Sequence, residues 1–158
     1  LWPFGGHVLQ RFELGANHLT VGVEVHADTR SFPAMAGWHP WFRRDLGTGG
    51  AAELIVDLSS ASMFALADDG IPTGELVSIP DGPWDACFVG LATDPVVRWP
   101  GVLDLTISST FDHWVIYTQP EHALCVEPQS GAPNDLNRDP QIVEPGAPLV
   151  GSMTLTWS

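Results

Sequence analysis

An alternation of apolar and polar residues with a period of two recurs along the chain and constrains its fold more than any other feature. Successive side chains of a β-strand point to opposite faces of a sheet, so this period predicts strands with one buried face. The pattern is clearest at residues 19–25, 54–58, 103–108 and 152–157. Weaker strands are expected at residues 8–14, 76–79, 86–91, 96–99, 113–118 and 123–126.

Glycine- and proline-rich turns separate these segments, at residues 15–17, 68–70, 80–83, 100–101 and 145–146. No segment carries a 3.6-residue apolar stripe over three turns, and at most a short helical turn follows Asn134. Many short strands joined by such turns are typical of an all-β antiparallel sandwich. We find no internal repeat and no linker, so residues 1–158 are expected to form a single domain.

The charge balance excludes several classes of function. The chain has 19 acidic residues and 6 basic ones, all arginine, with a net charge of −13. A field this acidic repels nucleic-acid phosphates and disfavours binding to an anionic membrane surface. The absence of lysine excludes a Schiff-base enzyme and a P-loop. No apolar run reaches the ~18–20 residues that cross a bilayer.

The cysteine count and the first residues bear on the compartment. Cys87 and Cys125 are too few for a disulfide scaffold, so we expect free thiols in a reducing cytoplasm, with a single disulfide as the alternative. The first residues lack the charged and apolar regions of a signal peptide. A cytoplasmic location is therefore expected.

Two segments break the strand alternation, residues 37–42 (GWHPWF) and residues 125–134 (CVEPQSGAPN). Each contains an ionisable residue directly before proline, His39 in the first and Glu127 in the second. Proline pushes its predecessor out of the helical region and removes the next ladder donor. We therefore expect both residues to be extended, at a strand end where the ladder stops, with side chains open to a cleft.

Five segments resemble, in order, those of the aldose 1-epimerase (galactose mutarotase) family. They are GWHPWF (37–42), DGIPTGE (69–75), WDACF (84–88), VIYT (115–118) and CVEPQSGAPNDLN (125–137). The resemblance implies an antiparallel β-sandwich of the galactose mutarotase-like supersandwich type and an enzyme that interconverts α and β anomers of a sugar. These segments belong to the later part of the family's domain. An Asn-Arg pair and a second histidine from its earlier part find no match, so the sandwich is expected to be incomplete at the N-terminus, with another chain or a missing N-terminal segment completing it.

The resemblance assigns Glu127 as the base and His39 as the acid, and requires no metal or organic cofactor. A glutamate and a histidine suit this exchange because burial and neighbours tune each toward the working pH. Asp85 matches a carboxylate that accepts hydrogen bonds from sugar hydroxyls, and Gln129 would hold the sugar or Glu127. Taken without the resemblance, each residue has a structural alternative. His39 would be a core histidine, Glu127 a surface glutamate, Asp85 a residue that caps a turn, and Gln129 a solvated side chain.

Seven tryptophans are many for 158 residues. Aromatic rings stack on the apolar faces of sugars, but tryptophan also fills cores. Trp38, Trp41 and Trp84 flank the candidate site residues and are therefore candidate sugar contacts. The remaining four are expected in the core: Trp2, Trp99, Trp114 and Trp157.

Arg43 and Arg44 follow the first segment and would suit a phosphate, which would make the substrate a hexose 6-phosphate. We prefer a solvated pair in a loop. The six histidines show no metal-ligand spacing, so no metal site is expected.

Three functions remain open. The first is an aldose 1-epimerase-type isomerase that acts on an aldohexose such as glucose or galactose. The second is a carbohydrate-binding β-sandwich without catalysis. The third is an interaction domain without a sugar site, in which His39 and Glu127 would lie apart or be paired elsewhere.

Overall fold

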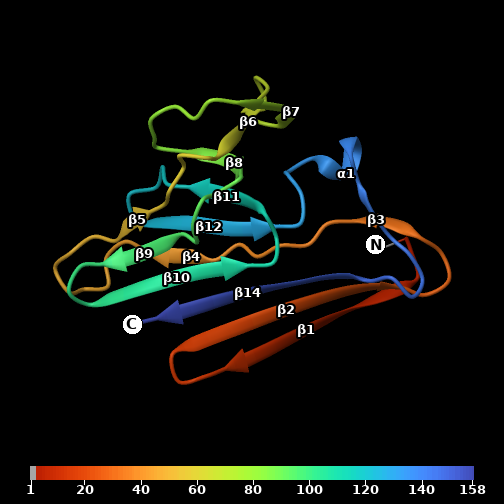
Figure 1. Cartoon of the computed structure of the whole chain (residues 1–158), viewed down its shortest axis with the longest axis horizontal. Coiled ribbons are helices and arrows are strands. Elements are labelled where there is room, and N and C mark those ends of the chain that lie inside the picture. The colour runs from red at the N-terminus through yellow and green to blue at the C-terminus, as the bar shows by residue number, and fades with distance from the viewer. Residues whose placement is uncertain (1–2) are drawn as a thin grey trace.

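The computed structural model describes residues 3–158, and two six-stranded antiparallel sheets form the body of the fold, which Figure 1 shows as two layers. The first sheet has the order β1 (Gly6–Leu14), β2 (His18–Ala27), β14 (Leu149–Trp157), β10 (Leu103–Ser109), β9 (Val96–Trp99) and β5 (Glu53–Ile55). The second has the order β4 (Trp41–Arg43), β12 (Ala123–Gln129), β11 (His113–Tyr117), β8 (Asp85–Val89), β6 (Ser62–Leu66) and β7 (Pro72–Val77). The predicted all-β antiparallel sandwich is confirmed.

A two-stranded sheet of β3 (Phe32–Ala34) and β13 (Gln141–Val143) and one helical turn, α1 (Asp135–Arg138), complete the fold. The helical turn follows Asn134 as predicted, and each predicted turn joins two successive strands. Four short strands were not predicted: β3, β4, β6 and β13. With three to five residues each, they are too short to show a clear alternation. Among residues 3–158, no helix has the length and apolar character needed to cross a membrane.

The main core lies between the two sheets. Ile107 of β10 and Val97 of β9 meet Leu124 and Val126 of β12 there, and all four are fully buried. Two predicted core tryptophans, Trp99 and Trp114, are buried in the same cluster, and Trp157 packs against it while partly exposed. The prediction for Trp2 lies outside the described residues.

The alternation along β12 separates core from site. Leu124 and Val126 face the core, so Cys125 and Glu127 project from the opposite, outer face of the second sheet. Both are nevertheless buried, Glu127 with only 3% of its surface exposed.

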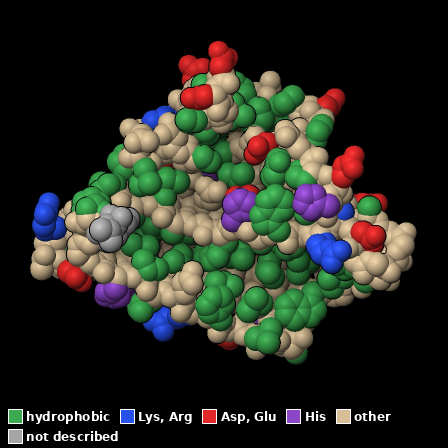
Figure 2. Space-filling model, turned by 180° about the vertical axis from the view of Figure 1, so that it is seen from behind, with side chains coloured by type: hydrophobic (Ala, Val, Ile, Leu, Met, Phe, Trp, Pro, Cys, Tyr) green, Lys and Arg blue, Asp and Glu red, His purple; other side chains and the backbone are tan. Residues whose placement is uncertain are grey.

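One face of β1 is continuous with the core-facing side of β2, but its hydrophobic side chains are exposed to solvent. Phe12 pairs with Val21 and Leu14 with Leu19, yet Phe12 is 67% exposed and Leu14 75%, whereas Val21 is 7% exposed. Figure 2 shows hydrophobic side chains gathered on the lower part of the molecule, the level at which Figure 1 places β1 and β2. Because β1 is also an edge strand, its outer backbone groups have no neighbouring strand in the sheet.

Candidate active site

Strand register places several polar and aromatic side chains in two adjacent rows on the outer face of the second sheet. In one row Cys125 lies between Trp41 of β4 and Tyr117 of β11, and Tyr117 is paired in turn with Asp85 of β8. In the next row Glu127 is paired with Val115, which is paired with Cys87. Asp85 is thus two strands from Cys125, roughly 10 Å at ordinary strand spacing.

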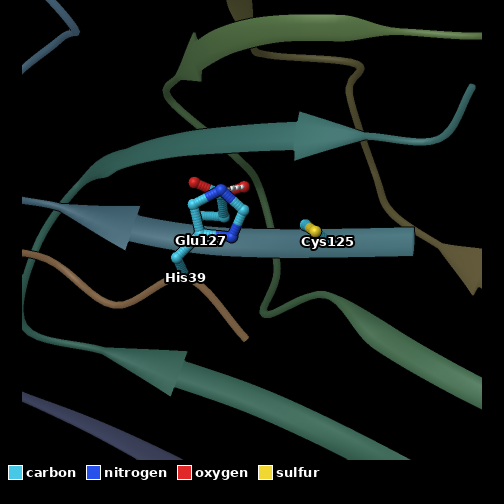
Figure 3. Close-up of side chains that lie close together, drawn as sticks. All are labelled: His39, Cys125 and Glu127. Atoms are coloured by element: carbon cyan, nitrogen blue, oxygen red, sulfur yellow. Dashed lines mark ion pairs between the residues drawn. The ribbon is translucent and has the colours of Figure 1, made fainter. Parts of the chain in front are cut away.

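The segment before β4 brings His39 to this face. Gly37 forms a bridge with Gln129, and the backbone N–H of Trp38 donates to the carbonyl of Pro128 at 3.1 Å. A Cβ on residue 37 would lie 2.9 Å from the Pro128 oxygen, so this close crossing requires glycine. The crossing brings His39 to Glu127, the residue that precedes Pro128 in β12. The His39 Nε2 lies 3.1 Å from Oε1 of Glu127 (Figure 3).

One expectation about the local backbone is wrong. The ladder was expected to stop at Glu127, but β12 continues through Pro128, paired with Trp114, to Gln129, paired with His113. Proline has no N–H, yet its carbonyl still accepts a hydrogen bond, and the Trp38 N–H supplies the donor. His39 is outside any strand, two residues before β4, as expected for a residue before proline.

The Glu127 carboxylate is buried and held by polar neighbours. Besides His39, Gln129 donates from Nε2 to Oε2 at 3.4 Å, and the Cys125 thiol forms a further hydrogen bond. Burial raises the pKa of Glu127, and the negative charge of Asp85 adds to the rise, against the opposing effects of His39, Gln129 and Cys125. A carboxylate that resists ionisation is a stronger base than an ordinary surface glutamate.

Aromatic rings flank the pair. Trp41, half exposed, is stacked on His39 with ring centroids 5.7 Å apart and on His122 at 6.2 Å, with the edge of Tyr117 at 5.8 Å. Trp38 is stacked instead on Phe111 at 5.5 Å and packs against the core. Trp41 therefore offers the freer aromatic face.

A cleft of about 250 Å³ opens beside the pair, lined by Met35, Ala36, Gly37, Trp38, His39, Glu127 and Gln129. This volume is just below the ~300–1,000 Å³ of most small-molecule pockets, which suits a ligand no larger than a single sugar ring. Four of the predicted site residues thus share one cleft, with Trp41 beside it.

The other two predicted site residues lie farther away. Asp85 is exposed on the same face of the sheet. Trp84 is not brought to this face: its ring packs edge-on against buried Phe88, in a cluster with Ile116, and its Nε1 donates to the Pro80 carbonyl at 2.9 Å. Its contacts are those of a side chain that closes the edge of the core.

Sequence reasoning missed Cys125 as part of this site. It precedes Glu127 by two residues in a strand, so the same-face rule could have placed it there. The donor atoms of His39, Cys125 and Glu127 all lie within 4.8 Å of one another and could hold a metal ion, which the sequence did not predict. Both cysteines are free, as predicted. Both are also buried, and burial raises the pKa of each thiol to about 12.

The arginine pair is not a solvated pair. Arg44 donates to the carbonyls of Thr118 at 2.8 Å, Pro120 at 3.0 Å and Ala52 at 3.5 Å, so its guanidinium ties β4 to neighbouring loops. Arg43 is exposed but is the last residue of strand β4, not part of a loop.

The fold is thus an antiparallel β-sandwich that holds a buried glutamate and an exposed histidine in contact on one face of a sheet. The profile of the aldose 1-epimerase family matches residues 1–156, and the chain belongs to that family. A search of curated proteins by sequence finds no match.

Two solved structures share the fold. The Slr1438 protein from Synechocystis sp. PCC 6803 superposes with a TM-score of 0.73 at 21% identity. The match covers 99% of this chain and 56% of the Slr1438 chain. The galactose 1-epimerase from Lactobacillus acidophilus NCFM gives a TM-score of 0.77 at 12% identity, with 99% and 58% coverage. The fold is therefore the galactose mutarotase-like β-sandwich, and the chain spans just over half the length of these two proteins.

Proposed function

We propose that this protein is an aldose 1-epimerase-type isomerase that interconverts the α and β anomers of an aldohexose such as glucose or galactose. Family membership and fold support a sugar epimerase type of function. The observation that carries the specific proposal is the 3.1 Å contact between His39 Nε2 and Glu127 Oε1.

The reaction explains why acid and base should lie so close together. Ring opening removes a proton from the anomeric hydroxyl and adds one to the ring oxygen, and both oxygens are bound to the same carbon. Glu127 takes the first proton and His39 donates the second. After the C1–C2 bond rotates, His39 takes its proton back from the C5 hydroxyl, and Glu127 returns its own to the new anomeric hydroxyl on the other face. No net proton is gained or lost, so the step needs no cofactor.

The neighbouring residues provide the sugar contacts. Gln129, which shares the cleft and already binds Glu127, would donate to a hydroxyl, and Asp85 would accept from hydroxyls at the far side of the ring. Trp41 would stack on the apolar face of the sugar, with Trp38 as the cleft wall. The two buried free thiols support a reducing, cytoplasmic location.

Two alternatives make different predictions. A carbohydrate-binding protein without catalysis would bind the sugar and leave its anomerisation rate at the buffer value. A hexose-6-phosphate epimerase would need a free cationic clamp, but Arg44 is already bonded to three backbone carbonyls. Of the arginine pair only the exposed Arg43 is left for a phosphate, which supports a neutral sugar over a phosphorylated one.

Polarimetry on freshly dissolved α-glucose and α-galactose tests the proposal. We expect the wild type to exceed the buffer rate, and Glu127→Gln and His39→Gln each to lower the catalysed rate by ~10²–10⁴-fold. Glu144→Gln, at an exposed position, is the matched control and should keep the wild-type rate. A wild-type rate equal to that of buffer, with sugar binding shown by calorimetry, would establish the non-catalytic alternative.

The uncovered face of β1 supports the expectation that further polypeptide covers this sheet. Exposed Phe12 and Leu14 on an edge strand favour association. We expect the isolated 158-residue chain to self-associate in sedimentation velocity, and Phe12→Asp to reduce this association. A monomeric, cooperatively melting wild type would refute the expectation.

A further inference from the structure

The proposed reaction leaves unused a third donor atom beside its acid and base. Cys125 lies two residues before Glu127 on the same face of β12, and in Figure 3 the His39 ring lies in front of Glu127 with the Cys125 thiol nearer the start of the strand. The imidazole nitrogen, the thiol sulfur and a carboxylate oxygen all lie within 4.8 Å of one another. In the part of the chain that the structure describes, these residues form the one such group.

We propose that His39, Cys125 and Glu127 form a binding site for a zinc ion, which excludes the sugar and reversibly inhibits the enzyme. The chemistry of the donors selects this class of metal. Imidazole and thiolate are the ligands that zinc prefers, with carboxylate as a common third, whereas calcium and magnesium take oxygen ligands. Three protein ligands leave a fourth position for water.

The distances are close to those a zinc site requires. With metal–ligand bonds of ~2.0–2.3 Å, tetrahedral zinc separates its nitrogen and oxygen ligands by roughly 3.3 Å, and sulfur from either by roughly 3.6 Å. His39 Nε2 and Glu127 Oε1 are already 3.1 Å apart. The sulfur lies at most 4.8 Å from the other donors, so side-chain rotations of about 1 Å at the donor atoms complete the site.

The cleft gives an ion access to two of the three ligands, His39 and Glu127. The His39 side chain is 59% exposed and lines the cleft, whereas Glu127 is 4% exposed and Cys125 is fully buried. A zinc ion entering from the cleft bonds to the Cys125 sulfur, to His39 Nε2 and to a Glu127 oxygen. The thiol proton and the proton that His39 Nε2 carries as the acid are released to solvent, and the carboxylate binds in its ionised form. The net charge of −13 favours accumulation of cations near the surface.

Zinc and sugar compete because both need the same two groups. Once Glu127 and His39 coordinate the ion, neither can accept or donate the protons of ring opening. The inhibition rests on the proposed function, but the metal binding does not.

Cobalt(II) titration tests the metal site independently of activity, because Co²⁺ replaces Zn²⁺ and gives a thiolate-to-cobalt charge-transfer band. The wild type should bind one Co²⁺ with this band and lose it when Zn²⁺ is added. Cys125→Ala should abolish the band, and Cys125→Ser does the same if the alanine variant fails to fold. Cys87→Ala is the matched control: Cys87 is also a buried free thiol, but lies beyond Val115, about two strands from Glu127, and its loss should leave the band unchanged.

The rate of anomerisation supplies the second measurement. Zinc should inhibit the wild type and Cys87→Ala alike, and Cys125→Ala should need at least ~10–100-fold more zinc for half-inhibition. A wild type without the band, a band that survives in both Cys125 variants, or equal zinc sensitivity in all variants would overturn the metal site. An inactive wild type that still shows the Cys125-dependent band would refute the epimerase proposal and leave the metal site intact.

Discussion

Replacement of Gly37 by alanine should damage both stability and activity, because this glycine allows the His39 segment to cross β12. An added Cβ would lie 2.9 Å from the Pro128 carbonyl oxygen and from Gln129 Cγ, about 0.5 Å inside the 3.4 Å at which ordinary contact begins. The Pro128 oxygen is backbone in a paired strand and cannot swing away, so the two segments must separate. The backbone of Gly37 does not have a positive φ, so no conformational strain adds to this contact.

The expected cost follows from two terms. Overpacking of this kind costs ~1–3 kcal/mol, and weakening the 3.1 Å hydrogen bond from Trp38 to Pro128 adds up to ~1 kcal/mol. Urea unfolding should therefore show a loss of about 1–4 kcal/mol. A shift of about 0.5 Å between His39 and Glu127 should also lower kcat/KM about tenfold, since a 1 Å misplacement can cost ~10²-fold.

Gly50→Ala is the matched control for this substitution. Nothing lies within 4 Å of a Cβ there, and Gly50 has no positive φ. This variant should be neutral or gain up to ~1 kcal/mol through a less flexible unfolded chain. If Gly37→Ala proved as stable and as active as Gly50→Ala, the close crossing would be refuted as the reason for this glycine.

Four further predictions concern ionisation and hydrogen bonding. Because burial raises the pKa of Glu127, kcat/KM should fall as the pH drops through a value above that of an ordinary glutamate. Because the pKa of Glu127 is raised in the folded state, folding stability falls as the pH rises through that folded-state pKa. Glu127→Gln should therefore have a higher Tm than the wild type at neutral pH and lose this advantage in acid. A Tm difference that does not change with pH would contradict this. Burial raises the pKa of Cys87 and Cys125 to about 12. Ellman's reagent should therefore label neither thiol in the folded protein and both in denaturant. Rapid labelling of the folded protein would count against their burial. Arg44→Met should lower the free energy of unfolding in urea by about 2–4 kcal/mol, because three hydrogen bonds to backbone carbonyls are lost. The control Arg43→Met, at an exposed position, should cost no more than ~0.5 kcal/mol. Equal losses in the two variants would show that the contacts of Arg44 do not stabilise the fold.

The strand pattern predicts most of the fold because each long strand has one buried face. Val21 and Ile107 are buried by the alternation that also identifies their strands, and glycine and proline mark the turns between them. Pro128 shows where local rules fail. A proline is expected to end a strand, but a donor from residue 38, distant in sequence, satisfies its carbonyl and lets β12 continue.

The site shows the same division between local and distant information. The residues before proline point to His39 and Glu127 as exceptions to the strand pattern, and the family resemblance supplies their roles. Whether two such residues meet depends on the register of β4 against β12, which no local pattern encodes. The sequence also does not show where Trp84 points: its neighbour Asp85 faces the site, but the Trp84 ring packs on Phe88. Nor does it show the three hydrogen-bond partners of Arg44, which lie in other segments of the chain.

The exchange of α and β anomers at equilibrium, measured by NMR exchange spectroscopy on the anomeric protons of glucose and galactose, tests the central claim most directly. The account predicts faster exchange with wild-type protein than in buffer for at least one of these sugars. It also predicts a ~10²–10⁴-fold loss of the catalysed rate in Glu127→Gln, with a folded structure retained. Exchange at the buffer rate with the wild type, or a Glu127→Gln variant as fast as the wild type, would contradict the assignment of Glu127 and His39 as the base and acid of an aldose 1-epimerase.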